Sequence, residues 1–198
     1  MGIYSNCLHH KKNKISAHLN ILIAEDEYDI ALLYKKALEV RNHRVTVTLN
    51  GEDCLKNYHD AFQEMIFSCT TTMKHFQLPF DVVLLDYKMP RINGLEVAKE
   101  ILAVNSHQRI IFASAYVKET LESSIKQLKQ LVELIQKPFT IMKLIDTIED
   151  KEVYAELQKL NVDIDIVRAL VPTHEQIIDL LERLRKIQKK NLNPVFIS

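Results

Sequence analysis

Residues 80–86 read FDVVLLD, a short apolar run that ends at Asp86. A run of this length, without alternating polar residues from position 82 onward, is typical of a strand buried on both faces of a sheet. We therefore predict a strand over residues 80–85, with Asp86 directly after its carboxyl end.

Strand-like and helix-like segments alternate on both sides of this run. The strands are rich in aliphatic and β-branched residues, and the helical segments carry apolar residues three and four positions apart. Such alternation predicts an α/β fold, a doubly wound parallel sheet of five (βα) units with right-handed crossovers. The predicted strands are 20–24, 44–48, 80–85, 109–113 and 131–135, and the predicted helices are 28–41, 51–62, 94–104, 118–129 and one from 139 onward.

Two segments lie outside this alternation, which defines a domain over residues 20–147. Residues 1–19 are polar and lack periodicity, so we expect a flexible N-terminal extension. Residues 148–198 are expected to form a helical C-terminal extension. One helical pattern, over 140–160, runs from the domain into this extension, and a second covers 164–171.

Composition excludes several classes of protein. The chain has 198 residues, and its 26 Lys and Arg balance its 26 Asp and Glu, so bulk charge favours neither nucleic acid nor an anionic membrane. Three cysteines without a C-x-x-C pattern predict a reduced, cytoplasmic protein, and no apolar window predicts a membrane span. Three glycines cannot build a dinucleotide or P-loop site. The eight histidines lack metal-ligand spacing and are expected on the surface.

Charged and hydroxyl side chains follow four of the predicted strands. In a parallel sheet of this kind, ligands bind beyond the carboxyl ends of the strands. Carboxylates gathered there repel one another unless a cation lies among them, and hard oxygen ligands suit Mg²⁺. The residues at these ends are Glu25, Asp26 and Glu27 after the first strand, Asp86 after the third, Ser114 after the fourth and Lys137 after the fifth.

This set of residues predicts phosphoryl-transfer chemistry. Asp86 is the candidate nucleophile, which would carry the group as an aspartyl phosphate. Glu25 and Asp26 are the candidate ligands of Mg²⁺. Ser114 and Lys137, together with the metal, would neutralise charge on the transferred oxygens, where electrostatic stabilisation matters most.

The motifs around these residues resemble the four signatures of the receiver domain of two-component response regulators. The resemblance implies a CheY-like, flavodoxin-like (βα)5 sheet, phosphotransfer from a sensor histidine kinase or a phosphotransfer protein, and slow self-hydrolysis rather than enzyme activity. It also implies that the backbone carbonyl of Lys88 binds the metal and that Pro138 is a cis-proline. The motifs are ILIAEDE (21–27), DVVLLDYKMP (81–90) followed by NG (93–94), FASA (112–115) and QKPFT (136–140).

The sequence departs from the family pattern in two places. The family often has an aromatic residue three positions before the lysine, where this chain has Leu134, so the usual hydroxyl–aromatic switch is in doubt. Tyr116 is an alternative on the loop after the fourth strand. The interval before Asp86 is also long, and we interpret residues 59–78 as an insertion that extends the second helix and ends in a Thr-rich loop.

The last predicted helix begins near Thr173, which forms a capping-box pattern with Gln176, and runs to residue 190. Its apolar positions, Ile177, Leu180, Leu184 and Ile187, form a seam able to pack on a partner. Its last turns are basic, which leaves DNA phosphates as an alternative partner.

The favoured interpretation is a response regulator that switches a protein-interaction or dimerisation surface when Asp86 is phosphorylated. In it, the C-terminal helices dock on the receiver or make a homodimer. The alternatives are a DNA-binding transcriptional regulator with these helices as output, and an unphosphorylated pseudo-receiver that serves as an adaptor.

Overall fold

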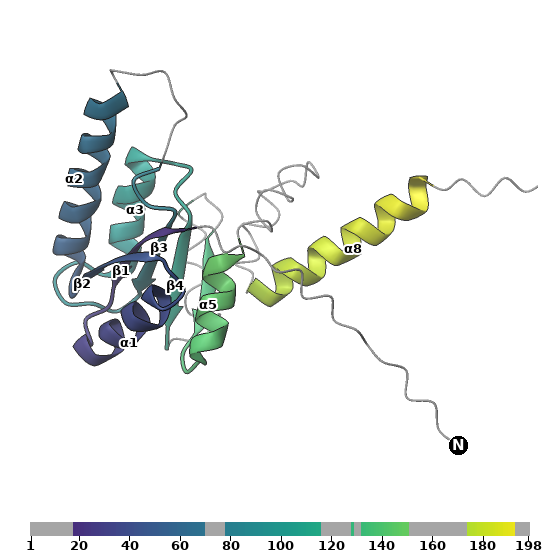
Figure 1. The fold of residues 1–198 in the computed structure, drawn as a ribbon, viewed down its shortest axis with the longest axis horizontal. Helices are drawn as coiled ribbons and strands as arrows, with labels where there is room; N and C mark the ends of the chain where they lie inside the picture. The colour runs from purple at the N-terminus through teal and green to yellow at the C-terminus, as the bar shows by residue number, and fades with distance from the viewer. Residues whose placement is uncertain (1–17, 70–77, 116–127, 129–131, 151–173, 193–198) are drawn as a thin grey trace, which may run out of the picture.

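A computed structural model describes residues 18–69, 78–115, 128, 132–150 and 174–192 of the chain (Figure 1). Its centre is a five-stranded sheet in the order β2-β1-β3-β4-β5, with every neighbouring pair parallel. The predicted α/β fold is therefore confirmed. The strands are β1 (Asn20–Ala24), β2 (Arg44–Thr48), β3 (Val82–Asp86), β4 (Ile110–Ser114) and β5 (Glu133–Gln136).

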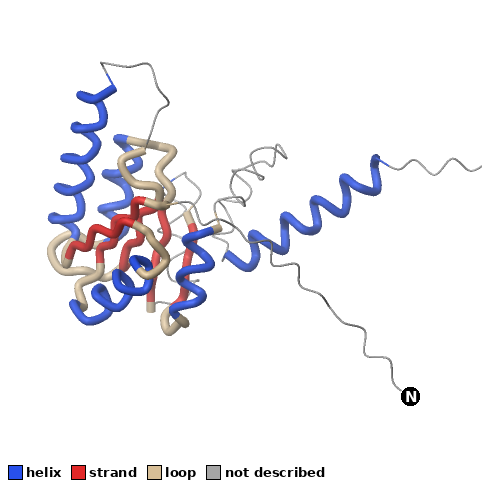
Figure 2. Tube along the Cα trace, in the orientation of Figure 1, coloured by secondary structure: helices blue, strands red, loops and turns tan. Residues whose placement is uncertain are grey.

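Helices cover both faces of the sheet (Figure 2). One face packs against α1 and α5, and the other packs against α2 and α3. This double cover explains why the central strands are apolar at nearly every position. The described helices are α1 (Tyr28–Glu39), α2 (Gly51–Cys69), α3 (Gly94–Val104), α5 (Ile141–Glu149) and α8 (His174–Leu192).

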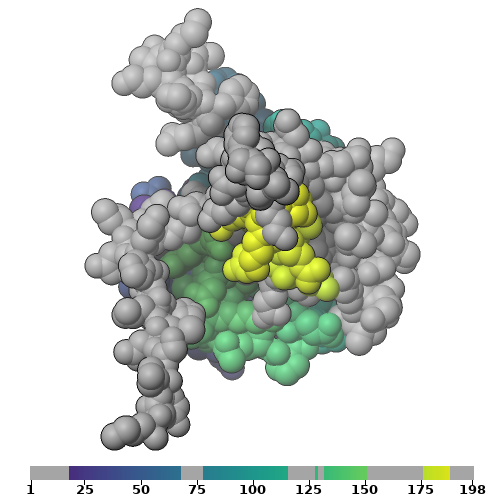
Figure 3. Space-filling view, turned by 90° about the vertical axis from the view of Figure 1, so that its right-hand side faces the viewer, coloured from purple at the N-terminus to yellow at the C-terminus, as the bar shows by residue number. Residues whose placement is uncertain are grey.

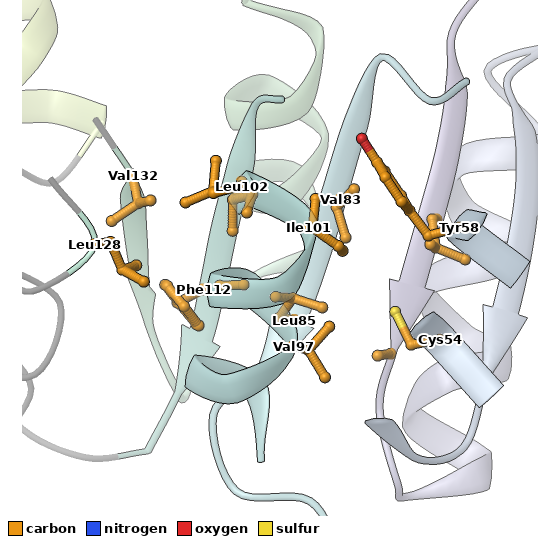
Figure 4. Packing of buried hydrophobic residues seen from close by; sticks show 14 of the residues in the cluster. Cys54, Tyr58, Val83, Leu85, Val97, Ile101, Leu102, Phe112, Leu128 and Val132 are labelled. Carbon is orange, nitrogen blue, oxygen red and sulfur yellow. The ribbon is translucent and has the colours of Figure 1, made fainter. Parts of the chain in front are cut away.

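Successive residues of each central strand enter different cores, because side chains alternate across a sheet. In β3, Val83 and Leu85 join the core beneath α2 and α3, whereas Val82 and Leu84 join the core beneath α1 and α5. Figure 4 shows the first of these cores, where side chains of the strands meet those of the two helices. This packing fixes the register of β3 and hence the position of Asp86 at its end.

Helix α2 is the long second helix predicted from the insertion, and it continues to Cys69. Its last turns extend past α3 in Figure 1, and Phe67 is 76% exposed. The first half of the helix is held against the sheet by Tyr58, which is fully buried and donates a hydrogen bond to Gln108. The predicted Thr-rich loop falls largely within residues 70–77, outside the described residues.

Two predictions near the amino ends of the strands are wrong. His43 is buried rather than on the surface, because its Nδ1 accepts the N–H of Leu19 and its Nε2 lies 3.1 Å from Glu149 Oε1. The long helix predicted over residues 140–160 is also interrupted. Helix α5 ends at Glu149, since Asp150 leaves the helical conformation at φ −82° and ψ 72°.

Helix α8 confirms the last predicted helix. Its side chains Ile177 and Leu181 are buried, and its backbone approaches β5. Figure 3 shows the helix in yellow beside the green surface that belongs to β5 and α5. Farther along, Ile187 is exposed, and the helix points away from the sheet (Figure 1). The helices predicted over 118–129 and 164–171 lie outside the described residues, apart from residue 128.

Candidate functional site

Three carboxylates meet at the carboxyl ends of β1 and β3. One oxygen from each of Glu25, Asp26 and Asp86 lies within 4.8 Å of the others. Glu25 is only 1% exposed and Asp86 is 8% exposed, whereas Asp26 lies at the surface. The structure therefore brings together the acidic residues predicted from the ends of two separate strands.

Lys137 supplies a positive charge to this cluster. Its Nζ donates to Glu25 Oε2 at 2.7 Å and to Asp86 Oδ1 at 3.1 Å. The backbone N–H of Lys137 donates to the carbonyl oxygen of Ser114 at 2.7 Å, which joins the ends of β4 and β5. Ser114 itself is buried at the end of β4. The ends of β1 and β3 and the residue after β5 thus bring charged side chains together, and the end of β4 joins them through the backbone carbonyl of Ser114.

The loop after Asp86 turns back tightly over the end of β3. Gly94 begins α3 so close to the strand that an added Cβ would lie 2.2 Å from the carbonyl oxygen of Asp86. Asn93 caps the helix and forms a capping box with Glu96. Within the loop, the backbone N–H of Lys88 donates to the Asp86 carboxylate, while the Lys88 side chain is exposed. Glycine is therefore required where this loop meets α3.

The site is electrostatically unbalanced, because three carboxylates lie close together and Lys137 bonds only two of them. Burial raises the pKa of Glu25 and of Asp86, and Lys137 offsets only part of this effect. Burial also acts to lower the pKa of Lys137, but the hydrogen bond and charge of Glu25, with those of Asp86, raise it overall. The site thus stabilises Lys137 as a cation, whereas burial opposes the charged forms of Glu25 and Asp86.

The donor set fits a divalent cation. Glu25 Oε1 is buried and has no hydrogen-bond partner among the described residues, although buried carboxylate oxygens normally have one. Three carboxylates at this spacing are hard oxygen ligands of the kind that Mg²⁺ binds. A cation here would satisfy the free oxygen and reduce the repulsion between the acids.

The remaining sequence-based candidates have mixed outcomes. The Lys137–Pro138 peptide bond is cis, as the resemblance implied. Leu134 is buried in the core beneath α2 and α3, so it is a packing residue. Tyr116 lies outside the described residues. No sequence motif marked Tyr34, yet its buried ring stacks on Phe139, beside the site.

Comparison with known proteins identifies the family. The sequence profile of the response regulator receiver domain matches residues 21–149, which is most of the chain and includes every residue of the site. The chain belongs to the response regulator receiver family. It is therefore a two-component response regulator, a phosphoacceptor signalling protein of the kind phosphorylated on aspartate.

Some relatives match over nearly their whole length, and others match over only about half of it. The chain is 26% identical over 129 residues to the response regulator receiver protein CpdR of Brucella abortus, covering 65% of this chain and 92% of CpdR. It is also 26% identical over 129 residues to the sporulation initiation phosphotransferase F of Bacillus subtilis, covering 65% of this chain and 90% of that protein. The nisin biosynthesis regulatory protein NisR of Lactococcus lactis is 35% identical over 130 residues, 65% of this chain, but the match spans only 48% of NisR.

Solved structures show the same fold. A CheY-like receiver domain protein from Methanospirillum hungatei superposes with a TM-score of 0.55 at 20% identity, over 72% of this chain and 98% of that one. CheY in the CheX–CheY–BeF3–Mg complex from Borrelia burgdorferi gives a TM-score of 0.52 at 21% identity, over 65% of this chain and 84% of that one. Within the described residues, no helix combines the length and apolarity needed to cross a bilayer.

Proposed function

We propose that Asp86 is the phosphoacceptor of this response regulator and that Glu25 and Asp26 hold Mg²⁺ beside it. The observation that carries the proposal is the meeting of three carboxylates around one ammonium, with Asp86 bonded to Lys137 at 3.1 Å. Asp86 stands at the end of the strand where the family motif places its acceptor. The backbone carbonyl of Lys88, in the next loop, is the further proposed metal ligand.

In the proposed reaction, an oxygen of Asp86 attacks the phosphorus of a phosphohistidine on a kinase or phosphotransfer protein. The bond from phosphorus to the donor nitrogen breaks, and its electron pair stays with the imidazole. Lys137 and the Ser114 hydroxyl stabilise negative charge on the transferred oxygens, and bound Mg²⁺ would supply further positive charge there.

The phosphoryl group is then lost slowly to water. Attack of water on phosphorus releases inorganic phosphate and restores the Asp86 carboxylate, so the domain acts as a timed signal rather than as an enzyme. We place this activity in the cytoplasm, with a sensor histidine kinase or a phosphotransfer protein as the donor.

We assign the output to the C-terminal extension and its helix α8. The first half of α8 buries Ile177 and Leu181 next to β5, the strand that leads directly into Lys137. A change at Lys137 is therefore able to reach α8 through β5, which favours a protein-interaction or dimerisation surface there. The homodimer is tested by sedimentation of the full chain with and without beryllofluoride and Mg²⁺.

DNA binding is a second candidate output, supported by Arg183, Arg185 and Lys186, which are exposed on α8. A gel-shift titration against salt separates the two outputs. Contacts to phosphates weaken steeply as salt rises, whereas an apolar protein interface does not.

The phosphoacceptor assignment is tested by incubating the full chain with acetyl phosphate and Mg²⁺ and measuring intact mass. Wild type is expected to gain one phosphoryl group in a Mg²⁺-dependent way, and Asp86→Asn to gain none. Asp146→Asn, the same chemical change at an exposed position of α5, is the matched control and is expected to be modified like wild type. An unmodified wild-type chain would instead support the pseudo-receiver adaptor.

A further inference from the structure

The position of Lys137 is not explained by the sheet alone. Strand β5 is separated from β1 by β3 and β4, so the ammonium of Lys137 must reach across two strands to bond Glu25. On one side its backbone is anchored by the hydrogen bond to Ser114. A second anchor is needed to fix the direction in which the side chain leaves the loop.

On the other side of Lys137, two stacked aromatic rings hold the loop. The ring of Phe139, two residues after Lys137, lies 5.6 Å from the ring of Tyr34, with an angle of 24° between their planes. Tyr34 is only 5% exposed and belongs to the core beneath α1 and α5, and the half-buried Phe139 packs against that core. Offset stacking of this kind adds a geometric preference to ordinary apolar burial.

Tyr34 lies close enough to the site to be affected by its charges. Burial raises the pKa of its hydroxyl to about 12, while the charge of Lys137 acts to lower this pKa and the charges of Glu25 and Asp86 act to raise it. No hydrogen bond from this hydroxyl is found among the described residues. The ring, rather than the hydroxyl, is therefore the part of Tyr34 in contact with the loop.

Helix α1 connects both halves of the site. It begins at Tyr28, directly after the strand end that carries Glu25 and Asp26. The same helix carries Tyr34, about two turns further on. A rigid element thus spans from the acidic residues to the loop that carries the lysine.

We propose that Tyr34 is a positioning residue, which directs Lys137 toward Glu25 and Asp86 by stacking on Phe139. The aromatic pair holds the loop after Lys137 against α1 while Ser114 holds the loop before it. The expected effect of Tyr34 on phosphorylation rests on the proposed function, whereas its effect on the placement of Lys137 does not.

The test compares Tyr34→Leu with Tyr34→Phe in the full chain. Leucine retains apolar bulk but cannot stack, whereas phenylalanine retains the ring. Tyr34→Leu is expected to slow phosphorylation by acetyl phosphate roughly tenfold, because small misplacements of a charge-stabilising group are costly. Tyr34→Phe is expected to keep most of the rate. Phe139→Leu removes the same stack from its other side and should reproduce the loss.

Two controls separate positioning from general destabilisation. Tyr58→Leu changes a fully buried tyrosine in the opposite core and is expected to lower the melting temperature without altering the rate. In a Lys137→Ala background, Tyr34→Leu should have no further effect, since the residue through which it acts is gone. An equal slowing in both backgrounds would overturn the proposal.

A second measurement does not depend on phosphorylation. The NMR signals of the Lys137 side-chain methylene next to Nζ, assigned by their loss in Lys137→Arg, should shift in Tyr34→Leu and stay in place in Tyr34→Phe and Tyr58→Leu. Unchanged Lys137 signals in Tyr34→Leu would refute the positioning role. If wild type accepts no phosphoryl group, the proposed function fails, and these signals still decide the role of Tyr34.

Discussion

Both ends of the sheet carry buried carboxylates next to basic side chains, but the charges are paired more completely at one end than at the other. At the amino ends of the strands, Glu133 is fully buried and pairs with Arg109 at 2.8 Å. The same guanidinium donates to the backbone carbonyls of Thr147 and Ile148, at the end of α5. At the carboxyl ends, three carboxylates lie close together, and Lys137 bonds only two of them.

A second pair at the amino end strengthens the contrast. Arg41 makes two hydrogen bonds of 2.8 Å to Glu149, and His43 lies beside the same carboxylate. The hydrogen bond from Arg41 lowers the pKa of Glu149, whereas burial raises the pKa of Glu25 and Asp86. Complete pairing thus stabilises the structure at one end of the sheet, and incomplete pairing at the other end fits the cation and phosphoryl group proposed to bind there.

The largest expected effect comes from breaking the buried pair at the amino end. Glu133→Ala should lower the free energy of unfolding by about 3–5 kcal/mol, because it leaves a buried guanidinium without its carboxylate. Urea denaturation measures this. The matched control is Glu52→Ala, which removes an equally short 2.8 Å contact to Arg91 between exposed side chains and should cost less than about 1 kcal/mol. Similar losses for the two variants would contradict the contrast.

Adding Mg²⁺ should stabilise the carboxyl end. A concentration ten times the dissociation constant is expected to add about 1.4 kcal/mol at neutral pH by mass action. Because the folded-state pKa values of Glu25 and Asp86 are raised, their contribution to stability is present below the ordinary pKa and is lost as pH rises through the folded value. Mg²⁺ should therefore stabilise more at neutral than at acidic pH.

Melting temperatures measured with and without Mg²⁺, from acidic to neutral pH, test this dependence. Asp26→Asn should weaken the response to Mg²⁺, and Glu149→Gln, at the other end of the sheet, should leave it intact. A response that is independent of pH, or equal in both variants, would place the cation elsewhere.

The smallest expected effects are changes of opposite sign in the free energy of unfolding, in two variants that replace a carboxylate with a carboxamide. Asp86→Asn should raise the free energy of unfolding by roughly 1 kcal/mol at neutral pH, because it removes a charge from a crowded buried cluster. Glu149→Gln should lower it by roughly the same amount, because it weakens a satisfied network. Chemical denaturation of both variants tests the comparison directly, and effects of the same sign would contradict it.

The pH dependence of the second variant gives a further check. The pKa of Glu149 is lowered in the folded state, so its contribution is present above the ordinary pKa of 4.5 and is lost as pH falls through the folded value. The difference between wild type and Glu149→Gln should therefore shrink in acid.

The sequence predicted those features that local patterns determine. Apolar runs located four strands and β-branched alternation located the strand over 44–48, and the rule that parallel strands end at one edge predicted that Glu25, Asp86 and Lys137 lie together. The roles of His43 and Tyr34 were missed, because each depends on a partner about one hundred residues away. His43 lies beside Glu149, and Tyr34 stacks on Phe139. No local pattern marks such pairs, and a histidine or tyrosine looks ordinary without them.

The separation between Glu25 and Lys137 has a consequence for protein synthesis. Their sequence separation of 112 means that a growing chain carries its acidic residues well before it carries the ammonium that bonds two of them. At about 5–20 residues per second, the lysine emerges about 6–22 seconds later. A chain cut short before residue 137 holds the acidic cluster without this partner. Translation past β5 to Lys137 is therefore a condition for assembling the site.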